Sequence, residues 1–196
     1  MRRDLQSTIL SVPPSNSPVR VSAPGRLLSW VPAALGLAAG AVLGGAVWTA
    51  THLQVDPALR TGALFVHLSS LIISFGAVLA VDWFALLWLL GRQSLVDLTK
   101  VSAAAHLPIW LGLLGLVLSG ALLRPDLSQP LTWLKLVLVL LVTLNGVRAY
   151  TIGEQLARFP AGTVPYWLLR RAVGAAAVSQ LGWWGATVIG FLNVQQ

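Results

Sequence analysis

Residues 65–87 read FVHLSSLIISFGAVLAVDWFALL, an almost unbroken apolar run that contains one histidine, His67, and one aspartate, Asp82. A run of this length predicts an α-helix that crosses a lipid bilayer, because about 20 apolar residues span the hydrocarbon core. An ionisable side chain at that depth costs about 2.5–3.5 kcal/mol even on a lenient insertion scale, so it usually faces a partner or a cavity. The stretch therefore indicates both the fold class and the neighbourhood of a functional site.

The composition of the whole chain supports an integral membrane protein in contact with the lipid bilayer. Of its 196 residues, 56% are hydrophobic and 10% are charged, and the mean hydropathy is +0.78. A soluble domain carries about 25% charged residues. The absence of cysteine excludes thiolate metal sites, iron–sulfur clusters and disulfides. The net charge of +7 comes without a nucleic-acid recognition motif, so no nucleic-acid partner is expected.

Five apolar segments predict an all-α bundle of five transmembrane helices within residues 26–196. The preceding residues 1–25 are polar and contain several prolines, and they are expected to form a disordered tail. A cleaved signal peptide is the alternative for the first segment, although a tail of about 30 residues is long for one. No internal repeat is evident. The predicted spans are residues 31–50, 62–91, 101–123, 131–150 and 166–192.

The distribution of basic residues predicts one orientation of the bundle. Only Arg60 and Arg124 lie on one side, Lys135 lies inside the fourth span, and the other ten of the 13 lysines and arginines lie on the opposite side. Cytoplasmic segments are enriched in such residues. The N-terminus is therefore expected in the cytoplasm and the C-terminus outside.

Small residues recur at helical spacing in the first and fifth spans. Such faces let helix backbones approach closely in lipid, where no hydrophobic force drives association. They are interpreted as packing surfaces within the bundle or, alternatively, as the interface of a homo- or hetero-oligomer. The two faces consist of Gly36, Gly40 and Gly44, and of Gly182, Ala186 and Gly190.

Polar residues inside the spans fall on two levels when depth is counted from the span ends. His67 and Lys135 each lie about five residues, at 1.5 Å per residue, inside the outer boundary. Asp82, His106 and Asn145 can share a second, inner level, either as a proton or ion site or as a structural cluster. For the outer pair, the simpler alternatives are a histidine bonded to a nearby serine or carbonyl and a lysine that extends to the interface.

A polar stripe follows one face of the second span. At 100° per residue, Ser70, Ser74 and Asp82 all lie within about 60° of His67 around the helix axis. This face is expected to turn away from lipid, toward the other helices.

The second and fourth spans resemble a known family. The segment FVHLSSLIISFGAVLAVDWFALL, with His67 and Gly76, resembles the first core helix of HemJ-type protoporphyrinogen oxidases and copper-resistance D-type membrane proteins of bacteria. The segment LTWLKLVLVLLVTLNG, residues 131–146, resembles the later helix in which the HemJ-type family carries its lysine, here Lys135. The resemblance covers residues 62–191. Asp82 directly before Trp83 is similar instead to an uncharacterised branch of that superfamily.

The resemblance implies a multi-pass protein of the bacterial inner membrane that binds b-type haem through His67 and Lys135. The first functional hypothesis is therefore a haem-binding redox protein, with no metal expected beyond the haem iron. A second hypothesis is a small proton, cation or metal transporter that uses the row from His67 to Asp82. A third is a non-catalytic membrane subunit or assembly factor. No catalytic residue follows from the sequence, and whether the chain is an enzyme stays open.

Overall fold

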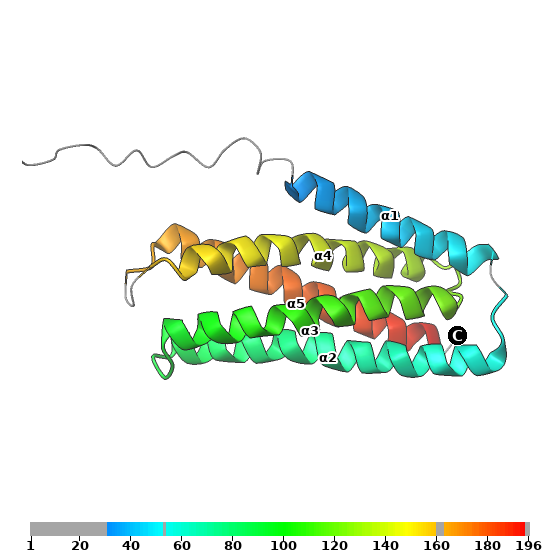
Figure 1. Ribbon diagram of the computed structural model, residues 1–196, viewed down its shortest axis with the longest axis horizontal. Helices are drawn as coiled ribbons and strands as arrows, with labels where there is room; N and C mark the ends of the chain where they lie inside the picture. The colour runs from blue at the N-terminus through cyan, green and yellow to red at the C-terminus, as the bar shows by residue number, and fades with distance from the viewer. Residues whose placement is uncertain (1–30, 53, 160–162, 195–196) are drawn as a thin grey trace, which may run out of the picture.

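The computed structural model of the chain describes residues 31–52, 54–159 and 163–194. These residues contain five α-helices (Figure 1). The expected tail, residues 1–25, lies outside the described residues. The all-α prediction is confirmed, since these residues contain helices and no strand. The helices are α1 (Val31–His52), α2 (Pro57–Leu89), α3 (Leu95–Leu122), α4 (Pro130–Leu156) and α5 (Tyr166–Val194).

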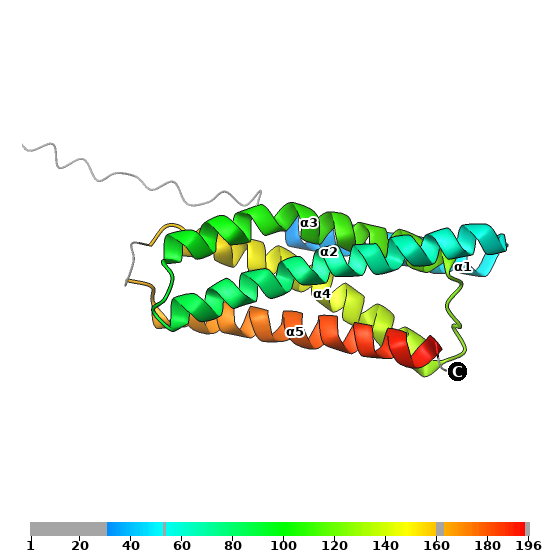
Figure 2. The ribbon, with the colours of Figure 1, turned by 90° about the horizontal axis from the view of Figure 1, so that it is seen from below.

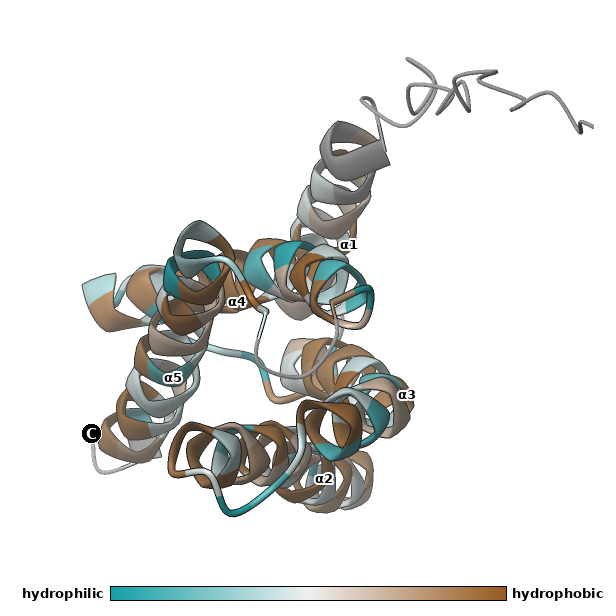
Figure 3. Cartoon of the chain, turned by 90° about the vertical axis from the view of Figure 1, so that its left-hand side faces the viewer, coloured by the Kyte–Doolittle hydropathy of each residue, from teal (hydrophilic) through white to brown (hydrophobic). Residues whose placement is uncertain are grey.

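Four of these helices, α2 to α5, are long and apolar enough to cross a membrane. Many large apolar side chains on their outer faces are exposed, among them Phe65 at 74%, Ile72 at 73% and Leu181 at 73%. Figure 3 shows predominantly hydrophobic ribbons along these helices. A water-soluble monomer rarely leaves so much contiguous apolar surface open. The chain is therefore a membrane protein whose outer surface contacts lipid.

The helix ends follow from local capping chemistry. The predicted second span begins at residue 62, whereas α2 begins at Pro57. The Asp56 side chain accepts a hydrogen bond from the Ala58 N–H at 2.7 Å, and Pro57 suits the first turn of a helix, so the helix starts earlier. α3 begins at Leu95 after Ser94, whose hydroxyl accepts from the Asp97 N–H at 3.1 Å. The helices therefore extend beyond the apolar segments from which they were predicted.

The bundle has two ends, which Figure 1 shows on the right and on the left. The α1–α2 and α3–α4 connections lie at one end together with the end of α5, and this is called the Arg60 end. The α2–α3 and α4–α5 connections lie at the other end, called the Arg92 end. Helix α1 packs on the outside against α3 and α4.

The transmembrane part consists of two helical hairpins, α2–α3 and α4–α5, each tightly packed. In the first, a Cβ added at Gly112 would lie 2.6 Å from Ser74 Cβ and 2.8 Å from the Ser70 carbonyl oxygen. In the second, a Cβ added at Gly182 would meet Val142. Small residues at a helix crossing allow this close approach.

The two hairpins repeat the same burial pattern. The same number of residues separates Gly112 from Gly182 and Gly115 from Gly185. Each of these glycines approaches the preceding helix of its own hairpin. The same separation relates further pairs with matching burial. The buried pairs are Ala105 and Ala175, Leu113 and Trp183, and Ser119 and Ile189. The structure therefore contains an internal repeat that was not evident in the sequence.

The core lies where the two hairpins meet. Phe75 and Val78 of α2 and Leu113 of α3 form one buried cluster with Val142 of α4 and Trp183 of α5. The Phe75 and Trp183 rings stack with their centroids 5.6 Å apart. Figure 2 shows α2 and α5 converging toward the Arg92 end and diverging toward the Arg60 end.

Candidate functional site

His67 lies on α2 in the half of the bundle nearest the Arg60 end, and its ring faces α3. Its Nδ1 lies 3.0 Å from Ser119 Oγ, and the carbonyl of Leu116 also interacts with the ring. The Ser119 hydroxyl donates its own proton to the Gly115 carbonyl at 2.5 Å. With its own proton directed to Gly115, Ser119 Oγ is placed to accept a hydrogen bond from His67 Nδ1. A neutral ring in that tautomer would leave Nε2 as the nitrogen able to bind a metal.

Lys135 lies on α4, at the position in the second hairpin that corresponds to His67 in the first. Ser70 and Ser74 of the first hairpin correspond to Leu138 and Val142 of the second, because these residues contact the equivalent glycines. His67 and Lys135 have the same separation in sequence as these two pairs. Lys135 is partly buried, and its charge acts on the His67 imidazole. Within the part of the chain that the structure describes, its ammonium has no hydrogen bond and no carboxylate partner. The two residues of the expected outer pair thus interact through charge, and no hydrogen bond among the described residues joins them.

An apolar layer separates this pair from the rest of the bundle. One turn further along α2 and α4 lie Leu71 and Val139, which pack with Leu116 against the buried core cluster. Asp82 lies beyond that cluster, about 22 Å from His67 along the helix at 1.5 Å per residue. The outer pair and Asp82 therefore belong to two separate sites.

Asp82 connects the two hairpins near the Arg92 end. Gln180 of α5 donates a hydrogen bond from Nε2 to the Asp82 carboxylate. Trp184 Nε1 in turn donates to Gln180 Oε1 at 2.9 Å, and the Trp184 ring packs edge-on against Phe75. Sequence reasoning considered His106 and Asn145 as partners of Asp82 and missed Gln180. The available signal was an amide side chain inside the apolar fifth span.

His106 and Asn145 have partners of their own. His106 Nδ1 donates to the Ser102 carbonyl at 2.7 Å, and its ring packs edge-on against Tyr150 at 4.9 Å between centroids. Asn145 is buried and donates from Nδ2 to the Ala175 carbonyl at 2.8 Å. No hydrogen bond among the described residues joins Asp82, His106 and Asn145 to one another. The structure therefore does not assemble them into one cluster.

The serines of the polar stripe lie inside the α2–α3 interface. Ser74 is fully buried at 0% exposure, and its hydroxyl donates to the Ser70 carbonyl at 2.6 Å. Both residues lie against Gly112, at the closest approach of the two helices. Their small size lets the helices meet, and the Ser74 hydroxyl is satisfied within its own helix. The stripe is part of the helix packing.

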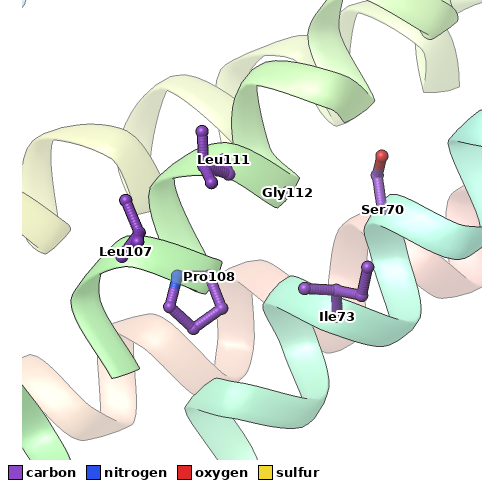
Figure 4. Close-up of a pocket in the computed structure, with 6 residues that line it drawn as sticks. All are labelled: Ser70, Ile73, Leu107, Pro108, Leu111 and Gly112. Atoms are coloured by element: carbon purple, nitrogen blue, oxygen red, sulfur yellow. The ribbon is translucent and has the colours of Figure 1, made fainter. Parts of the chain in front are cut away.

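A hollow of about 280 Å³ lies on the outside of the same hairpin (Figure 4). Ile73 of α2 and Leu107, Pro108 and Leu111 of α3 line it together with Ser70 and Gly112. Leu107 and Leu111 are exposed at 68% and 59%. These exposed leucines place the hollow on the lipid-facing surface of the hairpin.

The expected small-residue faces contribute unequally to packing. Gly36 of α1 approaches Leu144 of α4, and Gly182 of α5 approaches Val142. A Cβ added at Gly40, Gly44 or Gly190 would meet nothing within 4 Å. Packing inside the bundle thus accounts for one glycine of each face.

The donor groups of the described residues define which metal centres are chemically suitable. No group of three or more histidine, cysteine, aspartate or glutamate side chains lies together in the described ranges. A bare zinc or copper ion usually needs three or four protein ligands. A haem iron needs only one or two, because the macrocycle supplies four nitrogens. The imidazole of His67 and the amine of Lys135 are donor groups suitable for the second case.

Comparison of the chain with models of protein families, with curated proteins and with solved structures finds no match.

Proposed function

We propose that this membrane protein binds a b-type haem between its two hairpins and serves in electron transfer. The observation that carries the proposal is the hydrogen-bond chain from His67 Nδ1 through Ser119 Oγ to the Gly115 carbonyl. This chain sets the tautomer and orients the ring, as an outer-shell acceptor does for a metal-binding histidine. Haem, when bound, would supply reversible one-electron chemistry at its iron.

Lys135 is proposed as the second group at the haem, from the opposite hairpin. It is partly buried without a counter-ion among the described residues, and its charge acts on His67. A neutral lysine amine can bind iron, and an ammonium can balance negative charge on the macrocycle. Either role explains why a cationic side chain is kept at membrane depth.

The surroundings of the pair favour a redox centre over a transport pathway. The apolar layer around Leu71, Leu116 and Val139 blocks a continuous polar route from His67 to Asp82. Ser70 and Ser74, the intermediate members of such a route, are enclosed between α2 and α3. A buried apolar environment also tunes the potential of a haem.

We further propose that the N-terminus is cytoplasmic and that α1 is a fifth span. The ten basic residues assigned to one side, against Arg60 and Arg124 on the other, support this orientation. The Arg60 end would then face the outside of a bacterial inner membrane.

The absorption spectrum of the detergent-purified protein tests the haem proposal. With haem supplied during expression, we expect a Soret band that is lost or displaced in His67→Ala. His106→Ala is the matched control, because His106 also lies within an apolar span but its ring packs on Tyr150. A colourless wild-type protein, or equal loss of the band in both variants, would contradict the proposal.

A further inference from the structure

A polar hollow of about 550 Å³ opens at the Arg60 end of the bundle. Its lining comes from three parts of the chain: Thr51 of α1, Arg60 of α2, and the α3–α4 connection with Arg124, Asp126 and Ser128. In the sequence-based orientation, Arg60 and Arg124 are the two basic residues of this side of the membrane. Both line the same hollow although they are far apart in the chain.

The charges in the hollow do not neutralise one another. Asp126 accepts hydrogen bonds from the Ser128 N–H at 2.9 Å and from the Ser128 hydroxyl at 2.7 Å. Neither guanidinium has an ion-pair partner in residues 31–52, 54–159 and 163–194. Two guanidiniums and one carboxylate leave the hollow positively charged. Arginine binds carboxylates and phosphates in a bidentate manner, so the hollow suits an anionic group.

His67 does not line the hollow, but one arginine of the hollow lies on the helix of His67 and the other directly follows the helix that its ring faces. Arg60 and His67 are seven residues apart on α2, so they lie on one helix face about 10 Å apart along the axis. Arg124 follows the end of α3, one turn after Gly120, whose added Cβ would lie 3.4 Å from the His67 ring. Both arginines therefore belong to the hairpin that holds the histidine.

The backbone at Arg124 has a conformation that is uncommon for a residue with a side chain. Arg124 follows the C-cap residue Leu123 and has φ 51°, in the left-handed region. Glycine or asparagine normally occupies this position after a helix, because a side chain makes the conformation unfavourable. Strain of this kind concentrates at functional sites. An arginine in a glycine position is consistent with a ligand-binding role.

We infer that the Arg60–Arg124 hollow binds the propionate carboxylates of the haem and thereby fixes which edge of the macrocycle faces the Arg60 end. This inference rests on the proposed haem function and adds an anion site to it. The chemistry it requires is recognition of carboxylates at one edge of an otherwise apolar ligand. A haem whose propionates are esterified lacks that recognition while it keeps the iron.

The experiment compares the binding of haem and of haem dimethyl ester to haem-free protein in phosphatidylcholine nanodiscs. We expect the wild-type protein to prefer the free acid, and Arg60→Gln or Arg124→Gln to reduce the acid-to-ester affinity ratio by about tenfold each. Arg92→Gln, at the opposite end, is the matched control and should leave the ratio unchanged. The Soret position should be retained in all three variants, since His67 is intact.

Arg124→Gly separates binding from folding. Glycine relieves the left-handed backbone at this position, so the variant should unfold at a Tm equal to or above that of the wild type. It should nevertheless show the same reduced acid-to-ester ratio as Arg124→Gln. An unchanged ratio in Arg124→Gly would overturn the role of this arginine.

The outcomes distinguish this inference from the proposed function. Equal wild-type affinity for acid and ester, with a His67-dependent Soret band, overturns the inference and leaves the haem function standing. Failure to bind either compound overturns both. If the arginine variants lose bound phosphatidylglycerol in native mass spectrometry but keep the acid-to-ester ratio, the hollow binds a lipid headgroup and the inference is overturned.

Discussion

The α2–α3 hairpin and the α4–α5 hairpin share a packing plan and differ in the groups that occupy it. In the first, the side chains facing the close-approach glycines are Ser70 and Ser74. In the second, the corresponding side chains are Leu138 and Val142. Ser119, which accepts from His67, corresponds to Ile189, so the second hairpin offers no equivalent acceptor to Lys135.

The comparison indicates a division of roles between two related units. Glycines at the same places give both hairpins close contact, which is a requirement of the fold. The polar side chains differ between the hairpins. The first hairpin fixes the orientation of a histidine, and the second provides an unpaired cation. Two similar scaffolds with different side chains at one level can form a single two-sided site.

The largest expected effect tests whether the two close approaches are equally rigid. Gly112→Ala places its Cβ 2.8 Å from the Ser70 carbonyl oxygen, and a backbone atom cannot move aside easily. Gly182→Ala places its Cβ 2.3 Å from Val142 Cγ2, a side-chain atom of a buried valine whose χ1 is restricted within a helix. We expect Gly112→Ala to lower the free energy of unfolding by about 2–3 kcal/mol and Gly182→Ala by about 1–2 kcal/mol. Unfolding titrations in mixed micelles measure both.

Equal losses in these two variants would show that the hairpins tolerate extra volume alike. Gly40→Ala serves as the control, because an added Cβ there meets nothing within 4 Å. It should unfold at or slightly above the wild-type midpoint, since alanine favours the helix over glycine.

A second prediction concerns the contact that joins the hairpins to each other. Gln180→Leu removes the donor to the Asp82 carboxyl group and leaves that group without this partner within the apolar bundle. We expect it to cost about 1–3 kcal/mol of stability, the range for a buried polar group left without a hydrogen bond. In an Asp82→Leu background the same substitution should cost clearly less, because no polar group at position 82 then loses its donor.

A double-mutant cycle over the four proteins measures this coupling. Additive losses would show that Asp82 and Gln180 act independently. The Trp184 indole loses its acceptor in both Gln180→Leu proteins, so that effect cancels from the coupling energy.

The helices could be predicted from the sequence, whereas the partners of their polar residues could not. Hydropathy is a local property, so each predicted span corresponds to an observed helix, α1 to α5. Asp82 was expected to have a partner, and the structure gives it Gln180 in place of His106 or Asn145. The identity of Gln180 depends on the register of α5 against α2, which is set by tertiary contacts such as the Phe75–Trp183 stack.

The internal repeat escaped prediction because it preserves burial more than identity. Leu113 and Trp183 are both buried at equivalent positions, as are Ser119 and Ile189, yet neither pair is alike in side chain. The identical pairs are mostly small residues, among them Ala105 with Ala175, Gly112 with Gly182 and Gly115 with Gly185. In apolar helices such small residues are common, so an equal sequence separation between them does not by itself indicate a repeat.

The smallest expected effect sharpens the difference between the two hairpins at the His67 level. Ser119→Ala removes the hydroxyl that faces His67 Nδ1, so the ring keeps only its interaction with the Leu116 carbonyl. We expect a loss of about 1 kcal/mol in stability, the usual net value of one hydrogen bond. The ¹⁵N NMR signals of the ring should also show a mixture of Nδ1–H and Nε2–H tautomers in place of one form.

The reciprocal variant in the second hairpin completes the test. Lys135→His alone should give a ring without a fixed tautomer, because Ile189 offers no acceptor. Adding Ile189→Ser should restore a single Nδ1–H form, as Ser119 does for His67, if the hairpins are equivalent in geometry as well as in burial. A tautomer mixture that persists in the double variant would show that the equivalence ends at the packing level and that the first hairpin alone is shaped to hold an imidazole.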